Sequence, residues 1–144
     1  MGVDRTAEVT WDGGLFDGAG TITSVGSGAF GPLDVSWPSR AEEPDGRTSP
    51  EELIAAAHAA CYCMQLSHDL AEAGNVPEQL RASATITLEV GTGITSSRLR
   101  VAGTVPGIDQ EAFQRAADGA KDNCPVSGAM RGNVEMVVEA TLED

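Results

Sequence analysis

The sequence predicts one α+β domain, because segments that alternate like strands are interspersed with segments that have the periodicity and capping of helices. The chain has 144 residues, a length that suits a single domain with one core, and no repeat, linker or low-complexity segment divides it. Only 4% of the residues are aromatic, so the core must consist mainly of small and aliphatic side chains. Such a core buries little apolar area per chain, which favours further burial in an oligomer.

The first third of the chain predicts three short strands. Residues 6–11 alternate between polar and apolar side chains and end at the turn Gly13-Gly14. Residues 20–24 and 33–37 are the second and third strands. The polar segment 39–48, with the turn Pro44-Asp45-Gly46, is expected to be a loop.

A long helix is predicted to follow this loop. Ser49 is a suitable N-cap, Pro50 fits the first helical position, and Glu52 completes the Ser-x-x-Glu capping box. The helix is expected to run to about residue 73 and to end at Gly74. Its predicted buried stripe consists of Leu53, Ala57, Ala60, Met64 and Ala71.

The second half predicts a hairpin, two helices and a last strand. Residues 81–90 and 94–105 alternate strongly and are joined by Gly91-Thr92-Gly93. Asp109 is the expected cap of a second helix, and Pro125 opens a short third helix that ends near Gly132. Residues 133–142 are expected to form the closing strand.

Charge and cysteine content exclude several classes of function. The formal net charge of −13 repels nucleic acid and anionic membranes, which proteins bind through clustered Lys and Arg. The longest apolar run is too short to span a bilayer. Three cysteines are an odd number and lack the spacing of a secreted disulfide framework, so we expect a reducing, cytoplasmic location.

Two of the cysteines are candidates for chemistry. Cys61 lies on the long helix one turn after His58, and Cys124 lies at the start of the short helix. A sulfur at a helix start faces unpaired backbone N–H groups, which favour the thiolate. The pair is interpreted either as a redox couple or as two buried structural cysteines, and the spacing alone leaves both open.

Arg40 is the candidate for activating a thiol. A guanidinium close to Cys61 would lower the pKa of the thiol, and Glu51 would orient the guanidinium. The alternative is that Arg40 only forms a surface ion pair with the acidic loop that follows it.

A metal site is the competing chemistry. His58, Cys61, Cys63 and Cys124 supply nitrogen and sulfur ligands of the kind that zinc prefers. However, Cys61 and Cys63 point about 200° apart on a helix, so they do not easily meet one ion. Cys63 is therefore assigned to packing and His68 to the surface.

Three segments together resemble the OsmC/Ohr family, and with the order of elements they extend the resemblance over the whole chain. They are Thr48-Ser49-Pro50-Glu51-Glu52-Leu53-Ile54-Ala55-Ala56-Ala57-His58-Ala59-Ala60-Cys61, Val105-Pro106-Gly107-Ile108-Asp109 and Asn123-Cys124-Pro125-Val126-Ser127. The sequence His-Ala-Ala-Cys resembles the OsmC branch more than the organic hydroperoxide resistance branch. The resemblance implies antiparallel sheets packed around a central long helix, in an intertwined homodimer whose active sites lie at the interface.

The implied activity is thiol-dependent reduction of organic hydroperoxides, and more weakly of hydrogen peroxide, as a response to stress. By position, Cys61 matches the peroxidatic cysteine, Cys124 the resolving cysteine, Arg40 the activating arginine and Glu51 the carboxylate that holds it. Arg47 lies close enough in sequence to compete with Arg40. An external dithiol would complete the cycle, and no metal, flavin or haem is implied. A non-enzymatic redox-sensing module with the same fold is the alternative, and Cys63 is not expected to be a second resolving thiol.

Overall fold

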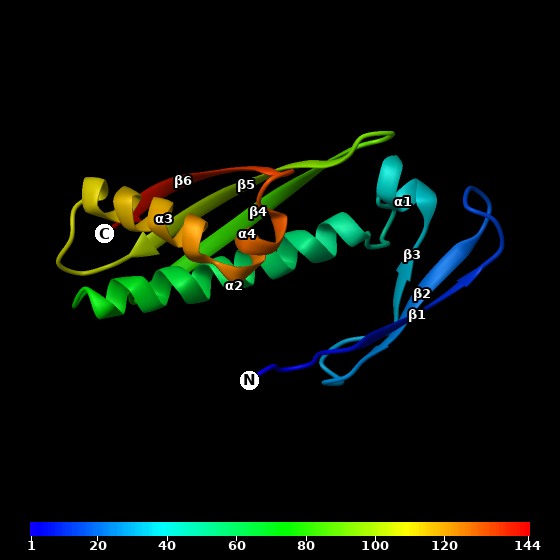
Figure 1. Ribbon diagram of the computed structural model, residues 1–144, viewed down its shortest axis with the longest axis horizontal. Helices are drawn as coiled ribbons and strands as arrows, with labels where there is room; N and C mark the ends of the chain where they lie inside the picture. Colours follow the sequence, from blue (N-terminus) through cyan, green and yellow to red (C-terminus); the bar gives the residue numbers. More distant parts are fainter. The chain divides into compact units, whose positions relative to one another are not determined.

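The computed structural model describes residues 1–144, and the chain divides into two compact units, residues 1–53 and residues 54–144 (Figure 1). The predicted α+β class is confirmed, while the single domain over residues 1–144 stays a prediction. The elements, in chain order, are β1 (Ala7–Asp12), β2 (Ala19–Val25), β3 (Leu33–Val35), α1 (Trp37–Ala41), α2 (Pro50–Glu72), β4 (Gln79–Glu89), β5 (Gly93–Thr104), α3 (Gln110–Asn123), α4 (Pro125–Met130) and β6 (Glu135–Glu143). None of the helices is long and apolar enough to cross a membrane.

The first unit contains a three-stranded antiparallel sheet in the order β1-β2-β3, which confirms the three predicted strands. The third strand is shorter than expected, because α1 begins at Trp37, and part of the segment predicted to be a loop is therefore helical. Ser36 and Ser39 explain this difference, since each hydroxyl accepts a hydrogen bond from the backbone N–H of the other, at 3.1 and 3.0 Å. This reciprocal cap satisfies the first turn of α1.

The long helix α2 confirms the predicted span almost to the residue. At its start, the Ser49 hydroxyl accepts a hydrogen bond from the Glu52 backbone N–H at 3.2 Å. The Glu52 carboxylate accepts a hydrogen bond from the Thr48 hydroxyl at 2.8 Å instead of closing the predicted box onto the Ser49 backbone. The Ser49 side chain therefore caps the helix, and Thr48 holds the Glu52 carboxylate beside it.

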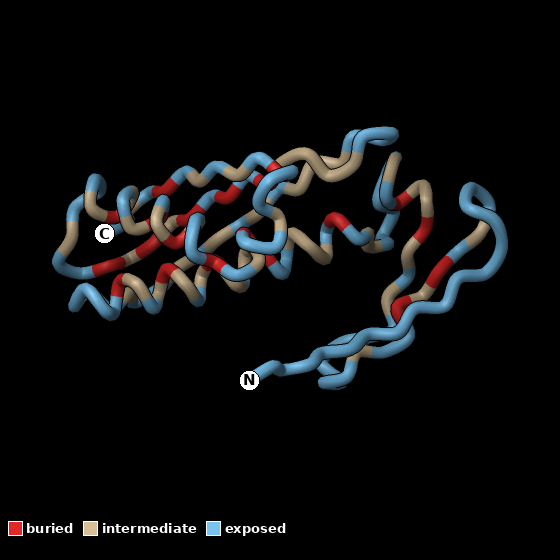
Figure 2. Tube along the Cα trace, in the orientation of Figure 1, coloured by how far each residue is buried: buried red, intermediate tan, exposed pale blue.

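The predicted buried stripe on α2 is wrong. Ala57, Ala60, Met64 and Ala71 are exposed, and Leu53 is only partly buried. The buried row in the second unit consists instead of His58, Tyr62, Leu66 and Leu70, which recur every four residues along the helix (Figure 2). Residues four apart lie on one face of a helix. The face with these large side chains therefore packs against the core, and the face with Ala57, Ala60 and Met64 does not.

The second unit contains a sheet in the order β4-β5-β6. The strands β4 and β5 form the predicted antiparallel hairpin, whereas β5 and β6 are parallel, which corrects the expectation of purely antiparallel sheets. The parallel pairing follows from the connection, because α3 and α4 return the chain to the same end of the sheet before β6 begins (Figure 1).

Two glutamines of α3 protect the free edge of β6. The Gln110 side chain accepts a hydrogen bond from the Leu142 backbone N–H at 2.7 Å and donates one to the Ala140 carbonyl at 2.9 Å. The Gln114 side chain accepts one from the Ala140 N–H at 3.1 Å. These contacts pair backbone groups that an edge strand would otherwise leave open to another chain.

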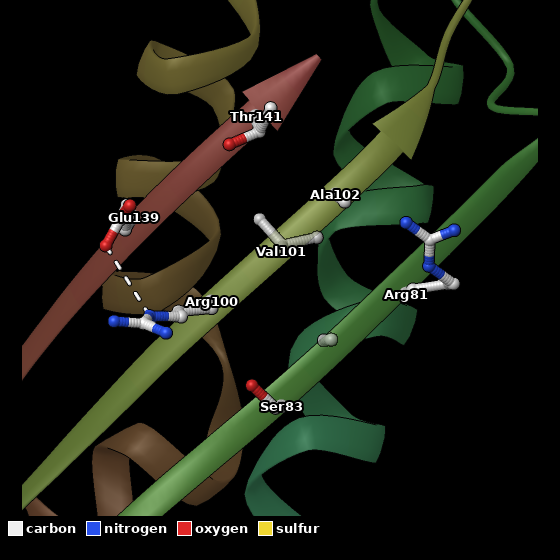
Figure 3. Close-up of a pocket in the computed structure, with 8 residues that line it drawn as sticks. Arg81, Ser83, Arg100, Val101, Ala102, Glu139 and Thr141 are labelled. Carbon is white, nitrogen blue, oxygen red and sulfur yellow. Dashed lines mark ion pairs between the residues drawn. The ribbon is translucent and has the colours of Figure 1, made fainter. Parts of the chain in front are cut away.

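The core lies between one face of this sheet and the helices α2 and α3. Its fully buried members from three elements are Tyr62 and Leu66 of α2, Leu99 of β5, and Phe113, Ala117 and Ala120 of α3. The opposite face of the sheet is exposed and polar, and Arg100 there lies 3.5 Å from Glu139 across β5 and β6 (Figure 3). The sheet therefore buries one face and leaves the other to solvent within this chain.

Candidate active site

The second unit brings Cys61 and Cys124 together. Cys61 lies in the middle of α2 and is partly exposed, whereas Cys124 separates α3 from α4 and is only 1% exposed. Both are free thiols, and the Cys124 side chain is close enough to raise the pKa of Cys61. One accessible thiol therefore lies beside one buried thiol, although 62 residues separate them in the sequence.

The surroundings of Cys61 favour its neutral form. Burial raises the pKa of the Cys61 thiol, and the hydrogen bond with Cys124 raises it further. A hydrogen bond from the Val126 backbone N–H acts in the opposite direction and lowers the pKa. Sequence reasoning anticipated a stabilised thiolate, and within this chain the contrary effects are larger. A cation close to Cys61 would be needed to reverse the balance.

The first turn of α4 acts on Cys61. It does not stabilise a Cys124 thiolate, which the sequence had suggested. Cys124 is the N-cap of α4 by backbone position, but its sulfur makes no capping hydrogen bond. The Val126 backbone N–H in the first turn instead lowers the pKa of Cys61. The helix start therefore stabilises negative charge on Cys61, the more accessible of the two thiols.

His58 is fully buried and uses both nitrogens of its ring. Its Nδ1 lies 2.7 Å from the Ser97 hydroxyl on β5, and its Nε2 lies 2.8 Å from the Ser127 hydroxyl on α4. All three side chains are 0% exposed. Sequence reasoning placed His58 beside Cys61 but missed both serines. The available signal was a serine at an inward-facing position of a strand, where a buried hydroxyl needs a partner.

Burial lowers the pKa of His58 below its ordinary value of 6.5. The folded state then binds fewer protons than the unfolded state once the pH falls below that value. We expect the free energy of unfolding to be fully retained above about pH 6.5 and to fall as the pH drops toward the folded-state pKa, by about 1.4 kcal/mol for each pH unit between the two values.

Denaturant titrations from about pH 8 to about pH 5 test this expectation. The matched variant is His58→Gln, which cannot titrate in this range and should lose less stability over the same interval. If the two proteins lose stability in parallel, other groups cause the acid sensitivity and His58 does not contribute to it.

Arg40 and Glu51 form an ion pair in the first unit. The Arg40 Nε donates a hydrogen bond to Glu51 Oε1 at 2.8 Å, and this is the only side-chain hydrogen bond of Arg40 within the chain. Glu51 is buried, and its Oε2 has no hydrogen-bond partner. Arg47, the alternative considered from the sequence, is exposed and forms no ion pair. The carboxylate therefore orients Arg40 and not Arg47, and leaves the terminal guanidinium nitrogens available.

An apolar hollow adjoins Arg40 within the first unit. It is lined mainly by Trp11, Leu15, Val35 and Trp37. The Trp37 ring also packs edge-on against Phe16, with ring centroids 5.8 Å apart. Trp11 is 40% and Leu15 51% exposed, so this unit presents a large apolar surface next to a charged group.

The residues considered for a metal site do not gather into one. No three side chains of His, Cys, Asp or Glu are close enough to hold an ion, and both nitrogens of His58 are already bonded to serines. Cys63 is partly buried and lines a surface hollow with the exposed His68, in keeping with the packing and surface positions expected for them.

Comparison with known proteins identifies the family. A family model described as OsmC-like protein matches residues 43–139. The chain is 36% identical to Peroxiredoxin OsmC of Escherichia coli (strain K12) over 139 residues, which covers 94% of this chain and 96% of that protein. It is 30% identical to Organic hydroperoxide resistance protein OhrB of Bacillus subtilis (strain 168), over 93% and 96% of the two chains. The crystal structure of OhrB of Bacillus subtilis superposes with a TM-score of 0.65 at 29% identity, over 96% and 98% of the two chains. The extent and identity of these matches, together with the shared α+β fold, show that this chain belongs to the OsmC-like protein family.

Proposed function

We propose that this protein is a thiol-dependent peroxidase that reduces organic hydroperoxides, and hydrogen peroxide more weakly. The observation that carries the proposal is a partly exposed Cys61 beside a buried Cys124 that raises its pKa. A peroxide can reach only Cys61 directly. Cys124 lies beside it, where it can attack the oxidised Cys61 sulfur. The names of the relatives, a peroxiredoxin and organic hydroperoxide resistance proteins, support the same chemistry.

The reaction needs only these two sulfurs and an external dithiol. The Cys61 thiolate attacks the distal oxygen of the hydroperoxide, the O–O bond breaks, and the alkoxide leaves as an alcohol after taking up a proton. Cys61 is then a sulfenic acid. The Cys124 thiolate attacks that sulfur, water leaves, and a disulfide forms. A dithiol reduces the disulfide by two exchange steps and is itself oxidised to a disulfide.

Arg40 and Glu51 are proposed to activate Cys61 in an intertwined homodimer. The pKa of the Cys61 thiol is raised within the chain, so turnover at neutral pH needs a cation, and Arg40 has terminal nitrogens without protein partners. Two surfaces that a second copy would cover support the dimer. One is the apolar surface of the first unit around Trp11 and Leu15, and the other is the exposed face of α2 that carries Ala57, Ala60 and Met64.

The proposed substrate has an apolar tail. The hollow beside Arg40 is lined by indole rings and aliphatic side chains, which favour a hydrocarbon over water. Hydrogen peroxide has no such tail, and its reduction is therefore expected to be slower. The free thiols of the cycle need a reducing compartment, which supports a cytoplasmic location and a role in the response to oxidative stress.

The proposal is tested by mixing the reduced protein with cumene hydroperoxide or tert-butyl hydroperoxide in the presence of dithiothreitol. We expect repeated turnover, faster than with hydrogen peroxide. Without the dithiol, peptide mass spectrometry should show a Cys61–Cys124 disulfide and a chain lighter by two hydrogen atoms. A single oxidation without further cycles would instead favour the redox-sensing alternative, and no reaction with any peroxide would contradict both.

A further inference from the structure

The buried cluster of His58, Ser97 and Ser127 has no part in the chemistry described so far. It connects three elements of the second unit, because its members lie on α2, β5 and α4. Burying three polar side chains costs free energy unless each finds a partner, and here every one does. An apolar cluster would fill this position without such a requirement, so the directional bonds are the feature to explain.

The imidazole of the cluster can donate to one serine and accept from the other. Burial lowers the pKa of His58, so its imidazole is neutral at physiological pH. A neutral imidazole donates through one nitrogen and accepts through the other, and the two serine hydroxyls complement it. Whichever tautomer is present, both contacts are short, and together they restrain the elements that carry the two serines.

Of these elements, α4 is the one whose position depends on contacts with other elements. The helix α4 has only six residues, and no side chain caps its start. Its first turn carries Val126, whose backbone N–H lowers the pKa of Cys61, and Cys124 immediately precedes it. Ser127 is the next residue after Val126 and bonds to Nε2 of His58. His58 is in turn one helical turn from Cys61 on α2.

We propose that His58 is a positioning residue that fixes the first turn of α4 against α2 through Ser127, so that Val126 and Cys124 meet the Cys61 sulfur. The proposal deepens the proposed function, on which its meaning for catalysis rests. A disulfide needs the two Cα atoms within about 4.4–6.8 Å of each other, so a small displacement of α4 slows closure of the bond. The same displacement removes the N–H that favours the thiolate.

The two serines supply a matched pair of variants. Ser127→Ala and Ser97→Ala each remove one fully buried hydrogen bond to the same imidazole, and the two distances differ by only 0.1 Å (2.8 − 2.7 Å). Their effects on the denaturation midpoint should therefore be similar. Only Ser127→Ala should raise the pH at which Cys61 is half alkylated by iodoacetamide, measured by peptide mass spectrometry. It should also slow closure of the disulfide after one equivalent of hydroperoxide, by roughly ten- to a hundredfold.

Two substitutions of His58 provide a rescue test. The amide nitrogen of glutamine reaches the place of Nε2, and that of asparagine the place of Nδ1. His58→Gln should therefore retain the contact with Ser127 and much of the rate of closure, and His58→Asn should not. Equal effects of Ser127→Ala and Ser97→Ala on Cys61, or of the two His58 substitutions, would overturn the proposal. The alkylation profile does not involve a peroxide, so a protein without peroxidase activity would contradict the proposed function and still leave this inference open to confirmation or refutation.

Discussion

Replacing Cys61 by serine should abolish hydroperoxide consumption. The serine hydroxyl does not ionise near neutral pH and cannot form a sulfenic acid, so the first step has no nucleophile. We expect a loss of at least about a thousandfold, the scale on which enzymes lose activity without their covalent nucleophile. The measurement is the initial rate of tert-butyl hydroperoxide removal with dithiothreitol present.

Two further cysteine variants make this result specific. Cys124→Ser should still be oxidised once by hydroperoxide, but it should stop at the sulfenic acid, which a dimedone adduct at Cys61 reports. Cys63→Ser is the matched control, because Cys63 lies two residues after Cys61 on α2 and lines a surface hollow to which Cys61 does not contribute. It should keep the activity of the unchanged protein. Turnover by Cys61→Ser, or inactivity of Cys63→Ser, would show that the wrong sulfur has been assigned.

Local chemistry made most of the elements predictable. Ser49, Asp109 and Pro125 are found at the helix starts where the sequence placed them, because capping depends on residues within one turn. Alternation located the strands because it, too, depends only on residues that are close in the sequence. It did not show that β6 runs parallel to β5, since alternation defines which side chains share a face and not which strand lies alongside.

The buried face of α2 was not predictable from hydrophobicity. Alanines occur on several sides of this helix, so they define no stripe, and the true core row includes His58 and Tyr62, which hydrophobic ranking places outside. Both are buried because each has a polar partner. His58 bonds to two serines, and the Tyr62 hydroxyl donates to the Ala117 carbonyl at 3.0 Å. Those partners are 39, 69 and 55 residues away, beyond the range of any local pattern.

The sequence singled out candidate site residues but did not indicate their electrostatics. Spacing and resemblance singled out Cys61, Cys124, Arg40 and Glu51, and the structure pairs the two thiols and, separately, the two ions. The raised pKa of Cys61 depends on how deeply α2 is buried and on which thiol approaches it. Both are properties of packing, which the sequence does not show. From the sequence alone, we expected the pKa of Cys61 to be lowered.

The second large effect is expected from Arg40→Ala. Burial and Cys124 hold the Cys61 pKa above its ordinary range within the chain, so an activating cation would have to supply the opposing shift. A neighbouring positive charge lowers such a pKa by about 1–3 units. Its loss would reduce the thiolate fraction about tenfold per unit, partly offset because a more basic thiolate is a better nucleophile. We therefore expect the rate of hydroperoxide reduction near pH 7 to fall by about tenfold or more, and to recover as the pH is raised.

Arg47→Ala is the control that decides the assignment. It removes the same charge from a chain of net charge −13, seven residues further along, at an exposed position with no ion pair. It should change neither the peroxidase rate nor the alkylation profile of Cys61. Arg40→Ala leaves the buried Glu51 carboxylate without its partner, so circular dichroism and the denaturation midpoint must show that the variant is folded before its rate is compared. If Arg47→Ala reproduces the defect, Arg47 is the activating residue. If neither variant shifts the pH at which Cys61 is alkylated, the thiolate does not depend on an arginine from this segment.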